Sequence, residues 1–113
     1  MRWRVEAHEV VSSWLESLAE EDPATFAKVM AALRKLETVG PTLGRPVADR
    51  IKGSELHNLK ELRPAGTSIR ILFIFGPSRA ALLLVAGDKA GNWRRWYRTN
   101  IPIAERRYRT WTF

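Results

Sequence analysis

The chain has 113 residues, a length that fills one hydrophobic core and predicts a single domain over residues 1–113. Its 45% of hydrophobic residues excludes a disordered polar chain, and its lack of cysteine excludes disulfides, thiol catalysis and cysteine-rich zinc sites. Nineteen Lys and Arg against twelve Asp and Glu give a net charge of +7, which favours polyanionic partners such as RNA, DNA or ribosomes.

The first part of the chain predicts a short strand and then two helices. Residues 3–5 are partly β-prone, and apolar residues recur on one helical face over residues 7–20. Asp22 before Pro23 is typical of a helix start, because the aspartate caps the first turn and proline lacks only an N–H that is free there. The second helix is predicted over residues 23–38 and ends before a Gly-Pro pair. The short connection predicts an antiparallel helical hairpin whose apolar faces cover a common sheet.

The middle of the chain predicts a loop and then a sheet. Residues 38–54 combine Gly and Pro with polar side chains, which predicts a loop with at most a brief turn of structure. Three strand-like runs follow, and the short Pro- and Gly-containing turns between them predict an antiparallel meander. These runs are residues 56–63, 68–75 and 80–86.

The last part of the chain predicts a C-terminal helix. Charged and aromatic residues alternate before Pro102, and after it Ala104, Tyr108 and Trp111 fall at helical spacing. The order of elements predicts an α+β fold, with the helical hairpin on one face of a small antiparallel sheet. The N-terminus has no apolar run of signal-peptide type, and no run is long enough to span a membrane, so we expect a cytoplasmic protein with no membrane partner.

Histidines and carboxylates give little support to two common ribonuclease chemistries. A two-histidine mechanism needs one imidazole as base and one as acid, and the chain has only His8, at a predicted helix start, and His57, at a predicted strand start. A Mg²⁺ site needs several converging carboxylates, whereas most acidic residues fall on the helical hairpin and Asp88 stands alone. We therefore expect no metal and no cofactor.

Cations and aromatic rings gather in the predicted sheet and just after it. Cations over a sheet face suit a phosphate, and aromatic rings suit a nucleobase, although the same rings also suit anchoring of the terminal helix. The cations are Lys60, Arg63, Arg70, Lys89, Arg94, Arg95 and Arg98, and the interleaved rings are Trp93, Trp96 and Tyr97.

Arg70 is the most informative of these cations. It interrupts the apolar run over residues 69–75, where burying a charge is costly unless an anion lies close. The anion is either Glu61, on the neighbouring predicted strand, or a bound phosphate. The residues alone leave both interpretations open.

As a combined pattern, several short motifs resemble the HigB-type, phage-derived branch of the RelE toxin superfamily. The resemblance covers almost the whole chain and implies a RelE-like microbial RNase fold. It further implies a type II toxin that cuts messenger RNA on the ribosome without a metal, a HigA-like helix-turn-helix antitoxin, and contact with operator DNA only through the toxin–antitoxin complex. The motifs are residues 43–46, 51–54, 58–63, 69–71 and 87–93, with Trp96-Tyr97 and Ile101-Pro102 after them.

The resemblance also implies roles for individual residues. Arg70 matches the strand arginine that holds the scissile phosphate, Lys89 occupies a position where relatives often have arginine, and Tyr97 matches the C-terminal tyrosine. We expect Arg70 to stabilise charge, Lys89 to act as acid or electrostatic partner, and Tyr97 to stack or to act as base. A base role for Tyr97 requires nearby cations to lower its pKa. The RNA or ribosome contacts expected are Lys60, Arg63, Arg94, Arg95 and Arg98.

Two other functions suit the same pattern. A ParE-like relative shares the fold but inhibits DNA gyrase and does not cut RNA, and fold alone does not separate the two. A plain basic RNA-binding domain would bind in a salt-dependent way without turnover. The set Arg70, Lys89 and Tyr97 favours the ribonuclease.

Overall fold

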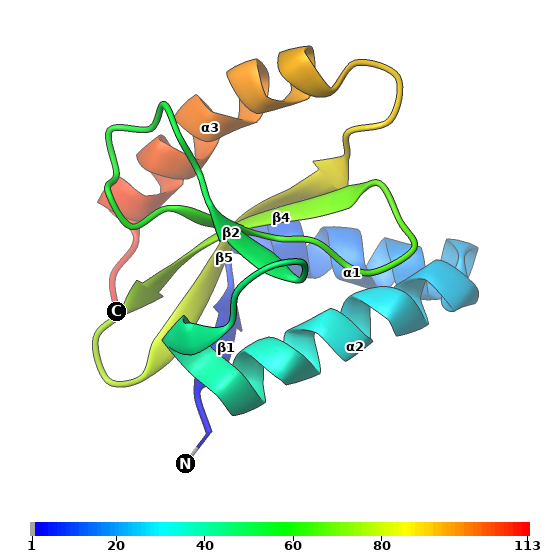
Figure 1. The fold of residues 1–113 in the computed structure, drawn as a ribbon, viewed down its shortest axis with the longest axis horizontal. Coiled ribbons are helices and arrows are strands. Elements are labelled where there is room, and N and C mark those ends of the chain that lie inside the picture. The colour runs from blue at the N-terminus through cyan, green and yellow to red at the C-terminus, as the bar shows by residue number, and fades with distance from the viewer. Residues whose placement is uncertain (1) are drawn as a thin grey trace.

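A computed structural model describes residues 2–113 and has the predicted order of elements, with a short strand and a 3-10 turn added between the second helix and the meander. Two helices follow a first strand, and a C-terminal helix ends the fold, which confirms the α+β class (Figure 1). The elements are β1 (Arg4–Ala7), α1 (Glu9–Glu21), α2 (Pro23–Val39), the 3-10 turn η1 (Gly40–Thr42), β2 (Ala48–Arg50), β3 (Lys60–Leu62), β4 (Ile69–Gly76), β5 (Ala80–Asp88) and α3 (Trp93–Thr110).

Local chemistry fixes the two ends of α2. The Asp22 side chain accepts a hydrogen bond from the backbone N–H of Thr25 at 3.2 Å, and Pro23 occupies the first turn. The helix stops at Gly40, whose φ of +71° and ψ of −146° suit glycine alone. A Cβ on Gly40 would lie 2.3 Å from the indole nitrogen of Trp3, so this turn also lets the N-terminal segment pack against the hairpin.

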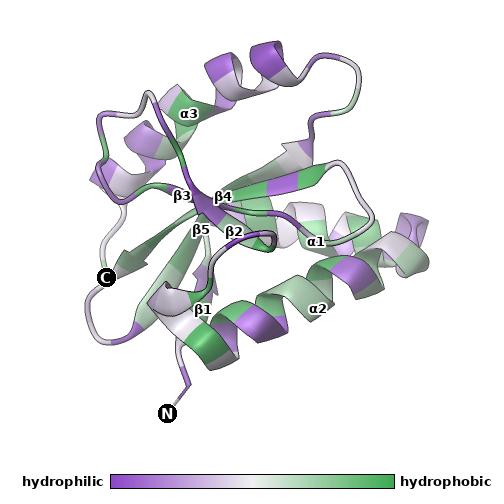
Figure 2. Cartoon of the chain, viewed as in Figure 1, coloured by the Kyte–Doolittle hydropathy of each residue, from purple (hydrophilic) through white to green (hydrophobic). Residues whose placement is uncertain are grey.

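The five strands form one sheet in the order β1-β5-β4-β3-β2. All pairs are antiparallel except β1 with β5, which is parallel. Helices α1 and α2 cover one face, as predicted, and α3 covers the other (Figure 1). The central strands β4 and β5 are apolar on both faces because each face carries a core (Figure 2).

The connection between the hairpin and the meander differs from the prediction. Part of the expected loop forms the short strand β2, and the strand expected over residues 56–63 is reduced to Lys60–Leu62. The reason is tertiary, since buried Glu105 in α3 accepts hydrogen bonds from Ser54 Oγ at 2.8 Å and from the backbone N–H of Glu55 at 2.7 Å. These bonds hold residues 51–59 away from the sheet as a loop.

Helix α3 also begins earlier than predicted and passes through Pro102. Asn92 caps its start by accepting a hydrogen bond from the backbone N–H of Arg95 at 3.1 Å. Apolar side chains on both sides of the proline, among them Trp96, Ile101 and Ala104, belong to the core that α3 shares with the sheet. This shared burial offsets the hydrogen bond that Pro102 does not donate. Within residues 2–113, no helix has the length and apolar character needed to cross a membrane.

Candidate functional site

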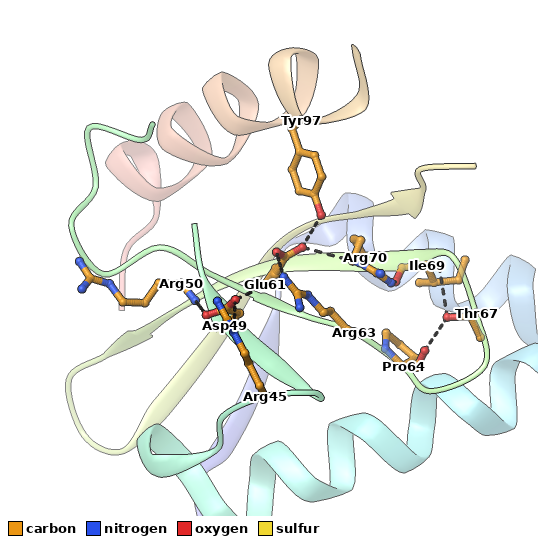
Figure 3. A network of polar contacts seen from close by, with 10 residues as sticks. All are labelled: Arg45, Asp49, Arg50, Glu61, Arg63, Pro64, Thr67, Ile69, Arg70 and Tyr97. Atoms are coloured by element: carbon orange, nitrogen blue, oxygen red, sulfur yellow. Dashed lines mark hydrogen bonds and ion pairs between the residues drawn. The ribbon is translucent and has the colours of Figure 1, made fainter. Parts of the chain in front are cut away.

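A buried carboxylate, Glu61 of β3, lies at the centre of a polar network between the sheet and α3 (Figure 3). Its Oε2 accepts a hydrogen bond from the Arg63 guanidinium at 2.9 Å, and its Oε1 lies 3.7 Å from Nε of Arg70. The phenol of Tyr97, which points down from α3, donates a hydrogen bond to the same Oε1. One carboxylate therefore contacts two cations and a phenol from three elements of the fold.

Strand register explains why these side chains meet. Glu61 pairs with Leu72 on β4, and Arg70 lies two residues before Leu72, so both side chains point to the face that α3 covers. Arg63 lies two residues after Glu61 and points the same way. The alternation of the strands thus places two arginines and one glutamate on a sheet face that is otherwise apolar.

Arg70 has the ion-pair partner that the sequence suggested, but this pair does not occupy all the hydrogen-bond donors of its guanidinium group. Its side chain is only 15% exposed, and one terminal nitrogen donates to the carbonyl oxygen of Ile69 at 2.7 Å. Its Nε is buried and lacks a hydrogen-bond partner within residues 2–113. Glu61 therefore offsets the charge of Arg70 and leaves a donor of the guanidinium unused.

The network extends from Arg63 toward the β2 edge of the sheet. Asp49 accepts a hydrogen bond from Arg63 at 3.4 Å and one from Arg45 at 2.9 Å. The backbone N–H of Arg50 and the side chain of Arg45 hold the pKa of Asp49 below its usual value. Alternating charges thus run from Arg45 through Asp49 and Arg63 to Glu61, and these contacts fix the arginines in place (Figure 3).

Tyr97 has an environment opposite to the one that a base requires. Burial and the hydrogen bond to Glu61 raise the pKa of Tyr97 to about 12, and the nearby Arg70 opposes this with a smaller lowering effect. A base role for Tyr97 is predicted from the sequence only on the condition that nearby cations lower this pKa. The carboxylate beneath the ring instead keeps the phenol protonated at neutral pH.

Lys89 directly follows β5 and lies beside the start of β4, at one edge of the sheet. Its backbone N–H donates to the carbonyl oxygen of Ser68 at 3.1 Å, which ties it to the start of β4. In the described part of the chain, no carboxylate lies within 4.0 Å of its ammonium group. Neighbouring Asp88 is engaged by Ser68 Oγ at 2.5 Å and by the N–H of Ala90 at 2.8 Å, and these bonds lower the pKa of Asp88.

The first two turns of α3 carry three exposed cations over this edge. Arg94, Arg95 and Arg98 all face solvent, and none of them forms an ion pair within residues 2–113. Trp96 packs so closely on Gly87 that a Cβ on this glycine would lie 2.9 Å from the indole nitrogen. Trp96 therefore anchors α3, which is one of the two roles that the sequence left open for these rings.

The structure does not bring every predicted cation to this face. Lys60 points to the hairpin side, where its ammonium donates to the carbonyl oxygen of Pro41 at 3.3 Å and lies 5.5 Å from the centre of the Phe75 ring. His8 caps α1 by accepting the backbone N–H of Val10 at 3.2 Å, in accord with its expected position at a helix start. His57 lines an open groove of about 440 Å³ together with Arg45, Arg50 and Lys52.

The sequence does not indicate the central place of Glu61 or the contribution of Asp49. Glu61 is predicted only as a possible partner of Arg70, and Asp49 falls in a predicted loop. The one available signal was an acidic residue beside an apolar one in a basic strand, as in Glu61-Leu62. Among the described residues, no group of three or more His, Asp or Glu side chains converges to hold a metal ion.

Comparison with known proteins gives a consistent result. The family model "Phage derived protein Gp49-like (DUF891)" matches residues 13–109. The chain is 56% identical over 101 residues to a Mycobacterium tuberculosis protein named "Putative toxin HigB3", and this match covers 89% of the chain and 86% of the relative. It is 45% identical over 100 residues to "Putative toxin HigB2" of the same organism, of which the match covers 48%. The chain therefore spans most of the first relative and about half of the second.

Proposed function

Because the chain belongs to the phage-derived Gp49-like family and to its HigB-type branch, we propose that it is the toxin of a type II toxin–antitoxin system. In this proposal it inhibits translation by cutting messenger RNA on the ribosome. The relatives are named as toxins, and Arg70 and Tyr97, two of the residues expected for phosphate chemistry, both contact Glu61 beneath α3.

One observation carries the assignment of RNA cleavage. Arg70 is held beneath α3 by Glu61 and by the carbonyl oxygen of Ile69, and Lys89, which forms no ion pair within residues 2–113, follows the neighbouring strand. Two cations at adjoining strand positions suit a phosphate that gains negative charge during the reaction.

The proposed reaction is attack of the ribose 2′-oxygen on the adjacent phosphorus. The bond to the 5′-oxygen breaks, which gives a 2′,3′-cyclic phosphate and a free 5′-hydroxyl. Arg70 stabilises the extra charge on the phosphoryl oxygens, and Lys89 supplies the proton that the leaving 5′-oxygen takes.

The base in this scheme is Glu61 acting through Tyr97. With a pKa of about 12 the phenol is a poor base by itself, but it already donates a hydrogen bond to Glu61. The phenol oxygen accepts the 2′-hydroxyl proton while its own proton passes to Glu61. The proton balance is then complete, since Glu61 gains one proton and Lys89 loses one.

The proposal includes the partners expected of such a toxin. A HigA-like helix-turn-helix antitoxin covers the protein, and operator DNA is contacted only through that complex. Exposed Arg94, Arg95 and Arg98 on α3, together with Arg63, contribute ribosome and RNA contacts in the cytoplasm.

A reconstituted translation system tests this function against the ParE-like alternative. The purified protein should stop peptide synthesis and shorten the added message, while leaving DNA supercoiling by purified gyrase unchanged. Inhibition of supercoiling with an intact message would overturn the proposal. An inactivated sample, the Arg70→Ala variant, serves as the matched control in both assays.

A further inference from the structure

The three aromatic residues at the start of α3 have different surroundings. Trp96 is packed on Gly87, and Tyr97 is bound to Glu61. Trp93, in the first turn, is 54% exposed and is among the most exposed large apolar side chains of residues 2–113. Core packing therefore accounts for Trp96 and Tyr97 but not for Trp93.

Trp93 lies on the same side of the helix as Tyr97, one turn earlier. Their ring centres are 6.4 Å apart, and the planes meet at 76°. The guanidinium of Arg94 lies 5.3 Å from the centre of the Trp93 ring. The indole thus contacts a cation and the phenol ring of the proposed site, while about half of the residue remains exposed to solvent.

We propose that Trp93 is a binding position for a nucleobase of single-stranded RNA, on which the base next to the cleaved bond stacks. This inference rests on the proposed function and adds the contact that holds the substrate. Aromatic side chains beside arginines are the usual platforms for unpaired bases, and the phosphates on either side of a stacked base need cations.

The surroundings of Trp93 favour RNA over a peptide segment. Arg94, Arg95 and Arg98 on the same helix are exposed, and none of them forms an ion pair among residues 2–113. An amphipathic protein helix needs a continuous apolar strip, whereas a base needs one flat ring with charges around it. Trp93 is a flat ring with charges around it, so its neighbourhood suits a nucleobase.

Single-turnover cleavage of messenger RNA on programmed 70S ribosomes tests the proposal. Trp93→Ala should reduce cleavage at subsaturating protein by about 5- to 150-fold, the range that one stacked base contributes. Trp93→Phe keeps a flat ring and should stay within about 3-fold of wild type. The loss should appear as a higher protein concentration at half-maximal rate, with the maximal rate less affected.

Phe113→Ala is the matched control, because Phe113 is an aromatic residue with a similar exposure of 49% that lies beyond the C-terminal end of α3 and packs on Gly76, away from Trp93. Its cleavage should equal that of wild type, and all variants should keep the wild-type circular dichroism spectrum. Wild-type cleavage by Trp93→Ala would overturn the stacking role and leave the proposed function intact. Failure of the wild-type protein itself to cut ribosome-bound message would overturn both.

Discussion

The phenol of Tyr97 in α3 donates a hydrogen bond to Oε1 of Glu61 in β3, the same carboxylate that pairs with Arg63 and Arg70. The C-terminal helix and the two arginines thus all contact a single buried group. The position of α3 over the sheet and the orientation of the cations are set together. Chemistry at this face and stability of the fold should respond to the same substitutions.

Glu61→Gln should destabilise the protein by about 3 kcal/mol, because it removes the charge that offsets two partly buried guanidinium groups. Urea unfolding followed by circular dichroism measures this loss. Glu55→Gln is the control, since Glu55 pairs with Arg109 at the surface and its side chain is 73% exposed. Its effect should be below about 1 kcal/mol. Equal effects of the two substitutions would contradict the central place of Glu61.

Tyr97→Phe should change how stability depends on pH at the alkaline end. The folded-state pKa of Tyr97 is raised from 10.0 to about 12, so its contribution is complete below pH 10 and is lost as the pH rises through 12. The difference in unfolding free energy between wild type and Tyr97→Phe should therefore shrink from pH 10 to pH 12. Urea titrations of both proteins across this range supply the measurement, and a constant difference would show that burial does not raise this pKa.

Glu105→Ala should release the loop over residues 51–59. The carboxylate of Glu105 is the acceptor for both Ser54 Oγ and the backbone N–H of Glu55, and Arg109 of α3 adds only an exposed ion pair with the Glu55 side chain. Trypsin should then cut after Lys52 at least about 10-fold faster than in wild type, because local opening exposes the backbone. Glu37→Ala, which removes a surface pair with Arg2, should leave that rate unchanged. Equal rates in the two variants would argue against a tether from α3.

Arg70→Ala should reduce ribosome-dependent cleavage by about 100-fold or more, the usual loss when a group that stabilises transition-state charge is removed. Lys60→Ala should retain activity within a few fold, because Lys60 faces the helical hairpin and not α3. Single-turnover rates on programmed ribosomes compare the two. A larger loss for Lys60 than for Arg70 would place the chemistry on the opposite face of the sheet.

Local sequence signals were sufficient for most of the fold. Asp22-Pro23 marks the start of α2, the apolar runs predict β4 and β5, and the order of elements gives an α+β class. The parallel pairing of β1 with β5 joins segments about 76 residues apart, as in Arg4 with Ala80, and no local pattern indicates it. The early start of α3 depends on burial of Trp96 against the sheet, which outweighs the breaking tendency of Pro102.

The candidate site was predicted only in part, because some of its features follow from local sequence and others from long-range contacts. Arg70 was identified because a charge in an apolar strand is conspicuous in the sequence. Lys60 is predicted on the same face as Arg63 and Arg70. Adjacent residues of a strand point to opposite faces, so Lys60, which precedes Glu61 and pairs with Phe73 of β4, points to the other face. The protonated state of Tyr97 depends on Glu61, which is 36 residues away in sequence. Contacts of this kind are set by packing and not by local spacing.

Primer-extension mapping on a defined message tests the central claim most directly. The purified protein is incubated with the message alone in EDTA, and with the same message on programmed 70S ribosomes, beside the Arg70→Ala variant. We expect cuts only in the ribosome-bound message, within the codon in the decoding site, with 5′-hydroxyl ends, and almost none with the variant. An uncut message in both arms, or equal cutting by Arg70→Ala, would contradict the account.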